Sequence, residues 1–352
     1  MQINLHFTCL FKKKAVTLRS NMNVFGEKWS FTSFGESHGA AIGGVLDGVP
    51  AGLHIDFAMI REELERRSKG VKELRSEGVS ARALREPDEV EWLSGVIEND
   101  KCQITNDKCL VTLGTPIAFL IRNKDARPED YEWLKTSYRV GHADKVYERK
   151  YGIRDWRGGG RASARETAAR VVAGCIAKQD LVKRGISIHA ELVQVGAETD
   201  PQKFAEVIEQ VRKKGDSIGG IVACVIKGLP VGTGEPIFNK LQAELAFAVM
   251  SINACKGFEY GTGFGGVTSK GSEINHLSGG IAGGISDGTD VTFRCVFKPT
   301  PSTKKSLNKL LNDSINDQIV NRQIVNRSDA CVATRAVPIV EAMTALALVN
   351  LL

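Results

Sequence analysis

The sequence lacks the cysteine patterns that mark metal-binding or disulfide-rich proteins. Eight cysteines occur in 352 residues, but none form a C-x-x-C pair, and the spacing from Cys102 to Cys109 fits neither a zinc finger nor a redox motif. Most of the others lie in apolar runs, as small buried hydrophobic residues do: Cys175, Cys224, Cys255, Cys295 and Cys331. We therefore predict no metal site, a reducing compartment and a cytoplasmic location.

Long apolar runs and a strong excess of one charge are also missing. We find no apolar run of roughly 18 residues, the length needed to cross a bilayer, and predict no contact with a membrane. Most of the formal net charge of +6 comes from Lys12, Lys13, Lys14 and Arg19, and aromatic residues make up only 7% of the chain. A nucleic-acid-binding protein would need a basic face with aromatic stacking residues, so we predict no nucleic-acid partner.

Several motifs of nucleotide and hydrolase chemistry are absent. No Walker A, H-E-x-x-H or nucleophile-elbow pattern occurs, which leaves nucleotide hydrolysis, metallopeptidase and serine hydrolase functions unsupported. Gly261, Gly263 and Gly266 satisfy G-x-G-x-x-G, but that fingerprint requires a strand before it and a helix after it. We predict a helix before it, and therefore no dinucleotide site there.

The N-terminal residues 1–21 are basic, contain no acidic residue and precede Met22. Their short apolar part, around Phe7 to Phe11, comes before the basic cluster, which is opposite to the order in a signal peptide. This order favours a mis-called start upstream of the true initiator over a targeting leader. We expect a single domain over residues 22–352, although the length alone would also allow two.

Glycine is abundant, at 36 residues, and lies mainly between predicted elements. Helical spacing of apolar residues predicts three helices: 163–183, 236–252 and Pro338 to the C-terminus. Alternation of apolar and polar residues predicts three strands: 186–195, 221–226 and 291–297. Residues 304–326 are polar and predict a surface segment. The mixture of helices and strands indicates an α+β protein.

A glycine run that opens into a helix is the most informative local feature. Residues 156–166 read Trp-Arg-Gly-Gly-Gly-Arg-Ala-Ser-Ala-Arg-Glu. Ser163 and Glu166 have the S-x-x-E spacing of a capping box, which marks the start of a helix. Free N–H groups at this helix start, together with Arg157, Arg161 and Arg165, would hold a phosphate or carboxylate. A capped helix with solvated arginines is the alternative.

Two histidines beside glycines in predicted loops are candidates for proton transfer near neutral pH. His38 follows Ser37 in Phe-Gly-Glu-Ser-His-Gly, and His142 belongs to Gly-His-Ala-Asp. Taken alone, each is as readily explained as a hydrogen-bonded loop histidine. His276, in another glycine-rich stretch, is open to both interpretations.

Two segments near the C-terminus add further charge. A glycine-rich stretch at 279–288 precedes a predicted strand and then Lys-Pro-Thr-Pro-Ser at 298–302, whose ammonium and hydroxyl groups suit a phosphate. Asp329 lies between Arg327 and Arg335, so its carboxylate should stay ionised and could act as a base. Turns without a ligand and an ordinary ion-pair cluster are the alternatives.

In this order, the motifs resemble those of chorismate synthases, over nearly the whole chain from Met22 to Leu352. The matching stretches are 31–39 (Phe-Thr-Ser-Phe-Gly-Glu-Ser-His-Gly), 141–144, 157–167, 250–254 (Met-Ser-Ile-Asn-Ala) and 327–331 (Arg-Ser-Asp-Ala-Cys). The resemblance implies a β-α-β sandwich, with long central helices packed between antiparallel sheets, and a homotetramer. It also implies a lyase of the shikimate pathway, which makes aromatic amino acids.

The implied reaction is the 1,4-anti elimination of phosphate from 5-enolpyruvylshikimate 3-phosphate to give chorismate. The implied cofactor is reduced FMN, which would lend and recover an electron without net redox change. Whether the protein also reduces its own flavin with NADPH is left open. A divergent relative that binds flavin or an anionic ligand without turnover is the alternative, but the catalytic positions of the family are intact in this sequence.

Positional matching to the family implies a role for individual residues. His38 would protonate the departing phosphate, His142 is associated with flavin protonation, and Asp329 with Ser37 would handle the proton at flavin N5. FMN contacts would fall on Arg161, Ala162, Ser163, Asn253, Ala254, Gly283, Lys298, Pro299, Thr300, Pro301, Ser302 and Arg327. The substrate or a pyridine nucleotide would contact Arg67, Arg75 and Arg335.

The sequence departs from the family pattern in several places. The usual R-R-x-P-G-x-S stretch is replaced by residues 66–75, and Val140 and Ala330 stand where the family usually has proline. The loop between Ser269 and His276 is shorter than usual. We expect these departures to affect rate and affinity more than reaction type.

Overall fold

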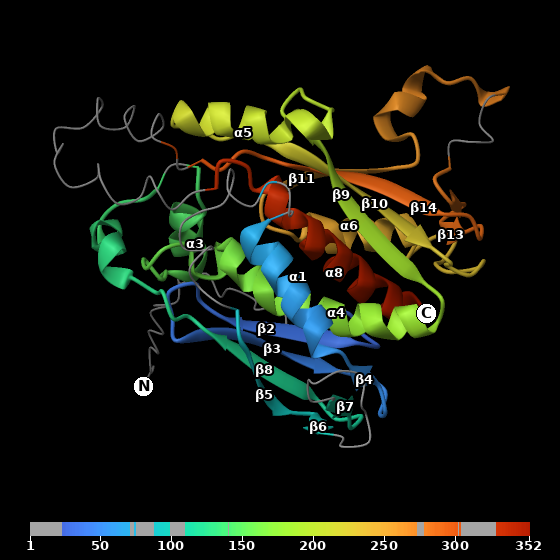
Figure 1. Cartoon of the computed structure of the whole chain (residues 1–352), viewed down its shortest axis with the longest axis horizontal. Coiled ribbons are helices and arrows are strands. Elements are labelled where there is room, and N and C mark those ends of the chain that lie inside the picture. The colour runs from blue at the N-terminus through green and yellow to red at the C-terminus, as the bar shows by residue number, and fades with distance from the viewer. Residues whose placement is uncertain are drawn as a thin grey trace, which may run out of the picture.

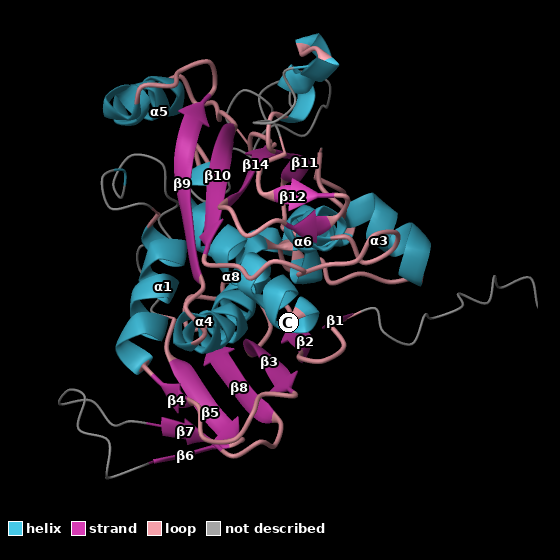
Figure 2. Ribbon diagram, turned by 90° about the vertical axis from the view of Figure 1, so that its right-hand side faces the viewer, coloured by secondary structure: helices cyan, strands magenta, loops and turns pink. Residues whose placement is uncertain are grey.

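The computed structural model describes residues 23–70, 74, 88–98, 110–139, 141–272, 278–301, 303 and 329–352, and the structural statements below concern these residues. Two antiparallel sheets enclose a layer of helices (Figure 1). Figure 2 shows the same three layers from the side. The predicted α+β sandwich, with helices packed between antiparallel sheets, is confirmed.

The first sheet has the strand order β1-β2-β3-β8-β5. Its strands are β1 (Val24–Phe25), β2 (Ser30–Gly35), β3 (Ala41–Asp47), β8 (Ile117–Arg122) and β5 (Val90–Ser94). Alternation along β8 buries Ile117, Phe119 and Ile121 against the helices. A short three-stranded sheet lies beside it: β4 (His54–Ile55), β7 (Leu110–Thr112) and β6 (Val96–Glu98).

The second sheet has the order β11-β14-β10-β9. Its strands are β11 (Cys255–Tyr260), β14 (Val291–Phe297), β10 (Gly220–Lys227) and β9 (Ser187–Val195). The last three confirm the predicted strands to within a residue or two. Helix α5 (Phe204–Lys213) lies at the outer end of this sheet (Figure 2), and β12 (Ile281–Ala282) pairs with β13 (Ile285–Ser286) in a short hairpin.

The helix layer between the sheets contains α1 (Phe57–Lys69), α4 (Thr167–Lys183), α6 (Leu241–Met250) and α8 (Ala333–Leu351). A further α-helix, α3 (Asp144–Tyr151), lies at one end of this layer. Buried apolar side chains from both sheets and from the helices form one continuous cluster. Five cysteines belong to this cluster as free thiols, as predicted: Cys175, Cys224, Cys255, Cys295 and Cys331.

Helix α8 is longer and more apolar than the sequence analysis predicted. It begins at Ala333, five residues before Pro338, because a proline in the second turn removes only one backbone hydrogen bond. By length and hydropathy α8 would suffice to cross a membrane, so the statement that no such segment exists was wrong. However, 83% of its most apolar window is buried between the sheets, which is the environment of a core helix.

The other two predicted helices begin later than expected. Two short 3-10 turns, Gly160–Ala162 and Ala164–Glu166, precede α4, which starts at Thr167. Ser163 does accept a hydrogen bond from the Arg165 N–H, but Glu166 pairs with Arg170, so the predicted reciprocal capping box does not form. Residues 236–240 are irregular, and α6 starts at Leu241.

The G-x-G-x-x-G stretch has a different context from the one we predicted. A strand, β11, and not a helix precedes Gly261. The element that follows is a 3-10 helix, Gly263–Thr268, and β11 pairs antiparallel with β14. A dinucleotide-binding unit requires a parallel strand and an α-helix there, so the stretch still does not form one.

The crossing of α4 and α8 depends on the absence of a side chain at Gly174. A Cβ added there would lie 2.4 Å from the Ala342 Cα and 2.5 Å from its carbonyl oxygen. Backbone atoms cannot withdraw as a flexible side chain can, so the two helices would have to separate.

Gly174→Ala should therefore destabilise the protein. Alanine is favoured over glycine by about 1 kcal/mol in a helix interior, but overpacking of a core costs about 1–3 kcal/mol. We expect a lower melting temperature for this variant and almost no change for Gly265→Ala, where an added Cβ meets no atom within 4 Å. Equal melting temperatures for both variants would contradict the tight crossing.

A buried cluster of four charges joins three helices of the layer. The Lys178 Nζ donates to Glu63 at 2.8 Å and to Glu341 at 2.6 Å, and Arg66 pairs with both glutamates. Glu341 also accepts the Ala190 N–H of β9 at 2.9 Å. Burial alone would raise the pKa of Glu341, but the charges and hydrogen bonds of Lys178 and Arg66 outweigh it and hold the pKa below its usual value.

Lys178→Met should destabilise the protein in a pH-dependent manner. In the wild type, Glu341 contributes stability that is present above its unfolded-state pKa and is lost as the pH falls through the lower folded-state pKa. Without Lys178, the buried glutamates lose a cation, which costs roughly 3–5 kcal/mol at pH 7. Denaturant titrations should show a larger deficit at pH 8 than at pH 5, because protonation relieves the uncompensated charge.

The exposed Lys183 on the same helix provides the matched control. Lys183→Met should change stability little at either pH. A deficit for Lys178→Met that is the same at pH 5 and pH 8 would show that the buried cluster does not stabilise the fold through charge.

Candidate active site

A cavity of about 600 Å³ lies at the end of the helix layer where α4 and α8 begin and α1 ends. This volume is in the range of small-molecule and cofactor sites. Most of the predicted site residues line it: Ser37, His38, Arg67, His142, Ala162, Ser163, Asn253, Ala254, Lys298, Pro299, Thr300, Pro301, Asp329 and Arg335. The structure therefore brings together segments that are up to about 300 positions apart in the sequence.

The turn between β2 and β3 carries Ser37 and His38 into the cavity wall, where both are nearly fully buried. The Arg127 N–H donates to the His38 Nδ1 at 3.3 Å, so neutral His38 carries its proton on Nε2. The Tyr131 ring packs edge-on at 4.7 Å between centroids. These contacts fix the orientation of the imidazole.

The glycine run passes directly over His38. Gly158 has φ of +75°, and a Cβ there would lie 2.7 Å from the His38 Cδ2. Glycine is required here because the backbone is left-handed, and because a side chain at this position would collide with the imidazole ring of His38. The run then turns into α4 and places Ala162, Ser163 and Arg165 on the cavity wall.

Three arginines from the ends of three helices meet at the base of the cavity. Arg67, in the last turn of α1, and Arg165, just before α4, both pair with the buried Asp88, the former at 2.8 Å. Arg335, in the first turn of α8, donates to Asp329 at 2.7 Å and to the Arg67 carbonyl oxygen at 2.8 Å. In the described part of the chain, three guanidinium groups thus pair with only two carboxylates.

The charges in this group alter one another's ionisation. Burial lowers the pKa of Arg67 to about 10; the positive charges of Arg335 and Arg165 add to this effect, and Asp88 opposes it. Burial would raise the pKa of Asp88, but Arg67 and Arg165 outweigh it and hold the pKa below its usual value. The Arg67 Nε has no hydrogen-bond partner among the described residues, although it is fully buried.

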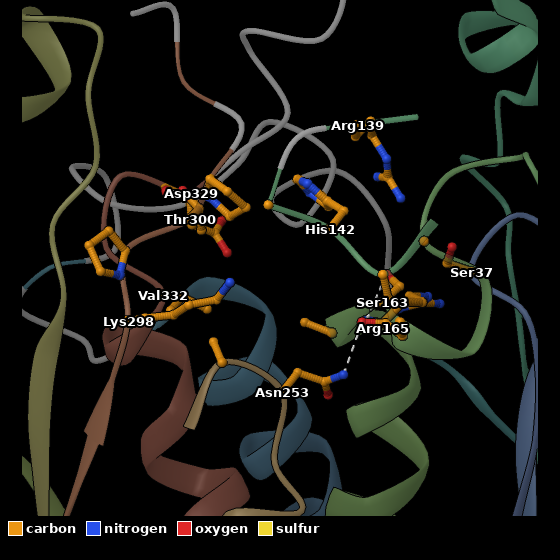
Figure 3. Close-up of a pocket in the computed structure, with 18 of the residues that line it drawn as sticks. Ser37, Arg139, His142, Ser163, Arg165, Asn253, Lys298, Thr300, Asp329 and Val332 are labelled. Carbon is orange, nitrogen blue, oxygen red and sulfur yellow. Dashed lines mark hydrogen bonds between the residues drawn. The ribbon is translucent and has the colours of Figure 1, made fainter. Parts of the chain in front are cut away.

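A further ion pair supports the segment that carries His142. Arg139 donates to Asp144 at 2.7 and 2.9 Å and to the Gly158 carbonyl oxygen at 3.1 Å. Burial would raise the pKa of Asp144, but Arg139 outweighs it and keeps the pKa low. The pair links the His142 loop to the glycine run, and Figure 3 shows the His142 ring over the cavity.

The opposite wall contains a strained backbone position and an unsatisfied polar atom. Ala254 has φ of +67°, a left-handed conformation that is uncommon for a residue other than glycine, and its carbonyl oxygen accepts the Lys298 N–H at 3.0 Å. Asn253 donates to the Ala162 carbonyl oxygen at 3.0 Å (Figure 3), while its Oδ1 is buried without a hydrogen-bond partner among the described residues. Lys298 extends into the cavity.

Two predicted FMN contacts lie outside this cavity. Arg161 donates to the Ser33 Oγ and to the Gly35 carbonyl oxygen. It lines an adjoining cavity that shares four residues with the first: Ala143, Asp144, Gly159 and Ala162. Gly283 lies in the short β12–β13 hairpin. Their roles in binding FMN stay predictions from the sequence. Arg75, Ser302, Arg327 and the ambiguous His276 lie outside the described residues.

Several cavity residues were not singled out from the sequence. Arg139, Tyr131 and Lys256 line the cavity, and Asp88 lies behind it between two arginines. Arg139 stands three residues before His142, so proximity to that motif could have indicated it. No local signal indicates the others, since long-range packing brings them to the site. In the described part of the chain, no three His, Cys, Asp or Glu side chains gather as a metal site would require.

Comparison with known proteins identifies the family. The family model for chorismate synthase matches residues 29–352. The chorismate synthase of Christiangramia forsetii is 45% identical, and the alignment covers 93% of this chain and 96% of that protein. The chorismate synthase of Parabacteroides distasonis is also 45% identical, and the alignment covers 94% of this chain and 98% of that protein. A crystal structure of a chorismate synthase superposes with a TM-score of 0.66 at 28% identity, covering 93% of this chain and 92% of the other. A match of this extent in sequence and fold shows that the chain belongs to the chorismate synthase family.

Proposed function

We propose that this protein converts 5-enolpyruvylshikimate 3-phosphate to chorismate and inorganic phosphate, with reduced FMN as its cofactor. The observation that carries the proposal is the convergence of His38, His142 and Asp329 in one cavity. Among the described residues, six cationic side chains and two carboxylates line that cavity. The cations are Arg67, Arg139, Arg165, Lys256, Lys298 and Arg335; the carboxylates are Asp144 and Asp329.

The excess of positive charge matches the ligands of this reaction. The substrate carries one phosphate and two carboxylates, and FMN carries a further phosphate. Guanidinium groups bind such oxyanions through strong charge-assisted hydrogen bonds, and these are strongest where water is excluded. The buried Nε of Arg67 still lacks a partner among the described residues, so it is available to an anion.

The residues predicted to hold FMN fit a planar, hydrogen-bonding group. Ala254 holds a strained backbone conformation next to the unsatisfied Oδ1 of Asn253, and strain of this kind is concentrated at ligand sites. Lys298 and Thr300, from the segment after β14, would contact its phosphate or ring edge. When bound, reduced FMN would supply an electron transiently and recover it, so that no net redox change occurs.

The acid–base residues have distinct positions around the space for the substrate. The elimination breaks the carbon–oxygen bond to phosphate and a ring carbon–hydrogen bond, and it forms a carbon–carbon double bond. His38 would donate its proton to the phosphate as it leaves with the bonding electron pair. Asp329 and Ser37 would handle the proton at flavin N5, and with it the proton lost from the ring; they lie on opposite sides of the cavity in Figure 3, so they would act on a group bound between them.

A direct test is turnover under anaerobic conditions. Purified protein, chemically reduced FMN and 5-enolpyruvylshikimate 3-phosphate should release chorismate and phosphate in equal amounts, because the reaction is an elimination with no other product. The two products are followed by absorbance and by a phosphate assay. Binding of both ligands without product would favour the alternative, a relative that binds flavin or an anion without turnover.

Arg67→Lys should weaken substrate binding. All three donors of lysine lie on one nitrogen, so lysine cannot hold Asp88 and also place a donor at the separate position of the Arg67 Nε, as the planar guanidinium does. Loss of one hydrogen bond to a charged group, about 1.5–3 kcal/mol, should raise KM roughly 10- to 100-fold. The matched control is Arg212→Lys on the exposed face of α5. An unchanged KM for Arg67→Lys would remove Arg67 from the binding site.

The remaining predictions concern assembly and environment. Several large apolar side chains are mostly exposed in the single chain, which supports the predicted homotetramer because such surfaces are usually covered by a partner: Ile237, Phe238, Phe247, Phe264 and Val267. Reduction of the flavin by NADPH and a cytoplasmic location stay predictions from the sequence.

A further inference from the structure

We infer that Asn123 is a positioning residue that holds the turn carrying His38 and couples it to the arginines of the anion site. This inference rests on the proposed function, in which His38 acts as the acid. Asn123 does not line the cavity and would not contact the substrate. It directly follows β8, and its side chain is buried.

The Asn123 amide closes the turn between β2 and β3. Its Nδ2 donates to the carbonyl oxygens of Glu36 and Gly39, both at 2.9 Å. These two residues flank Ser37 and His38, so one amide group fixes both ends of the segment that bears the acid. The Asn123 backbone N–H adds a bond to the Ala40 carbonyl oxygen at 3.1 Å.

The other end of the same amide contacts the anion site. The Arg165 Nε donates to the Asn123 Oδ1 at 3.0 Å, and Arg165 also pairs with Asp88. Because a guanidinium can only donate, Oδ1 must face Arg165 and Nδ2 must face the turn, which fixes the orientation of the amide. A shift of Arg165 on binding an anion would therefore be transmitted to the His38 turn.

The segment after Asn123 supports the imidazole itself. Arg127, four residues further on, donates its N–H to the His38 Nδ1, and Tyr131 packs against the ring. The residues from Asn123 to Tyr131 thus hold both the backbone and the side chain of His38. The position of the acid strongly affects the rate of catalysis, since a misplacement of about 1 Å can reduce a rate on the order of 100-fold.

Asn123→Asp is the most selective perturbation. The carboxylate has nearly the shape of the amide and can still accept from Arg165, but it has no N–H to donate to Glu36 and Gly39. Asn123→Ala, which removes the contacts without adding charge, is the second variant. Gln179→Glu is the matched control, because the Gln179 amide is also buried and also hydrogen-bonds the backbone. It accepts the Asp56 N–H and donates to the Asp56 carbonyl oxygen, just before α1.

Two measurements test the inference. In anaerobic turnover, both Asn123 variants should lose kcat by a factor on the order of 10 to 100 while KM changes less than about threefold, because the substrate contacts remain. In spectra of the ¹⁵N-histidine-labelled protein without ligands, the ring signals of His38 should move in both variants. Those of His54 and His189 should stay in place. The chain has six histidines, and a His38→Gln variant assigns the relevant signals.

The outcomes separate a positioning role from a merely structural one. Gln179→Glu should lower the melting temperature without moving the His38 signals or kcat. If all three variants lose kcat in proportion to lost stability, or if the His38 signals stay unchanged in both Asn123 variants, the inference is overturned. If the wild type shows no turnover, the proposed function fails, and the spectra still decide whether Asn123 orients His38.

Discussion

The site depends on the close approach of three guanidinium groups, those of Arg67, Arg165 and Arg335, at one end of the helix layer. Like charges in a buried place repel strongly, and they are tolerated here because Asp88 pairs with both Arg67 and Arg165 while Asp329 pairs with Arg335. Among the residues that the structure describes, the balance is incomplete, since three cations face two carboxylates. A ligand with several negative charges would complete it, and this requirement fits the proposed substrate, which carries one phosphate and two carboxylates.

The rest of the fold keeps these groups in place. Each of the three arginines lies at a helix end, so the packing of α1, α4 and α8 sets their separation. Gly174 allows α4 and α8 to cross closely, and the buried cluster of Lys178, Glu63, Glu341 and Arg66 ties the same helices together. The proposed acid–base residues lie in loops around this end: His38 in the turn between β2 and β3, His142 just before α3 and Asp329 just before α8.

The sequence predicted the sheets and the chemical character of the site better than its helix boundaries. Strands such as β10 and β14 were predictable because their alternating apolar residues face one core. The start of α4 was misplaced because Ser163 caps a 3-10 turn and not the helix, and α8 was cut short because Pro338 is tolerated inside it. Asp88, Asn123 and Tyr131 carry no local signal, and only long-range packing reveals that they support the arginines and His38.

We expect the cavity to select its ligand by charge, because the cations that line it outnumber the carboxylates among the described residues. The measurement that tests this expectation is calorimetric binding of the proposed substrate, 5-enolpyruvylshikimate 3-phosphate, and of chorismate to the wild-type protein without reduced flavin, so that no turnover occurs. We expect chorismate, which lacks the phosphate, to bind at least about tenfold more weakly, as loss of a charge-assisted contact implies. Equal affinities for the two compounds would contradict the account.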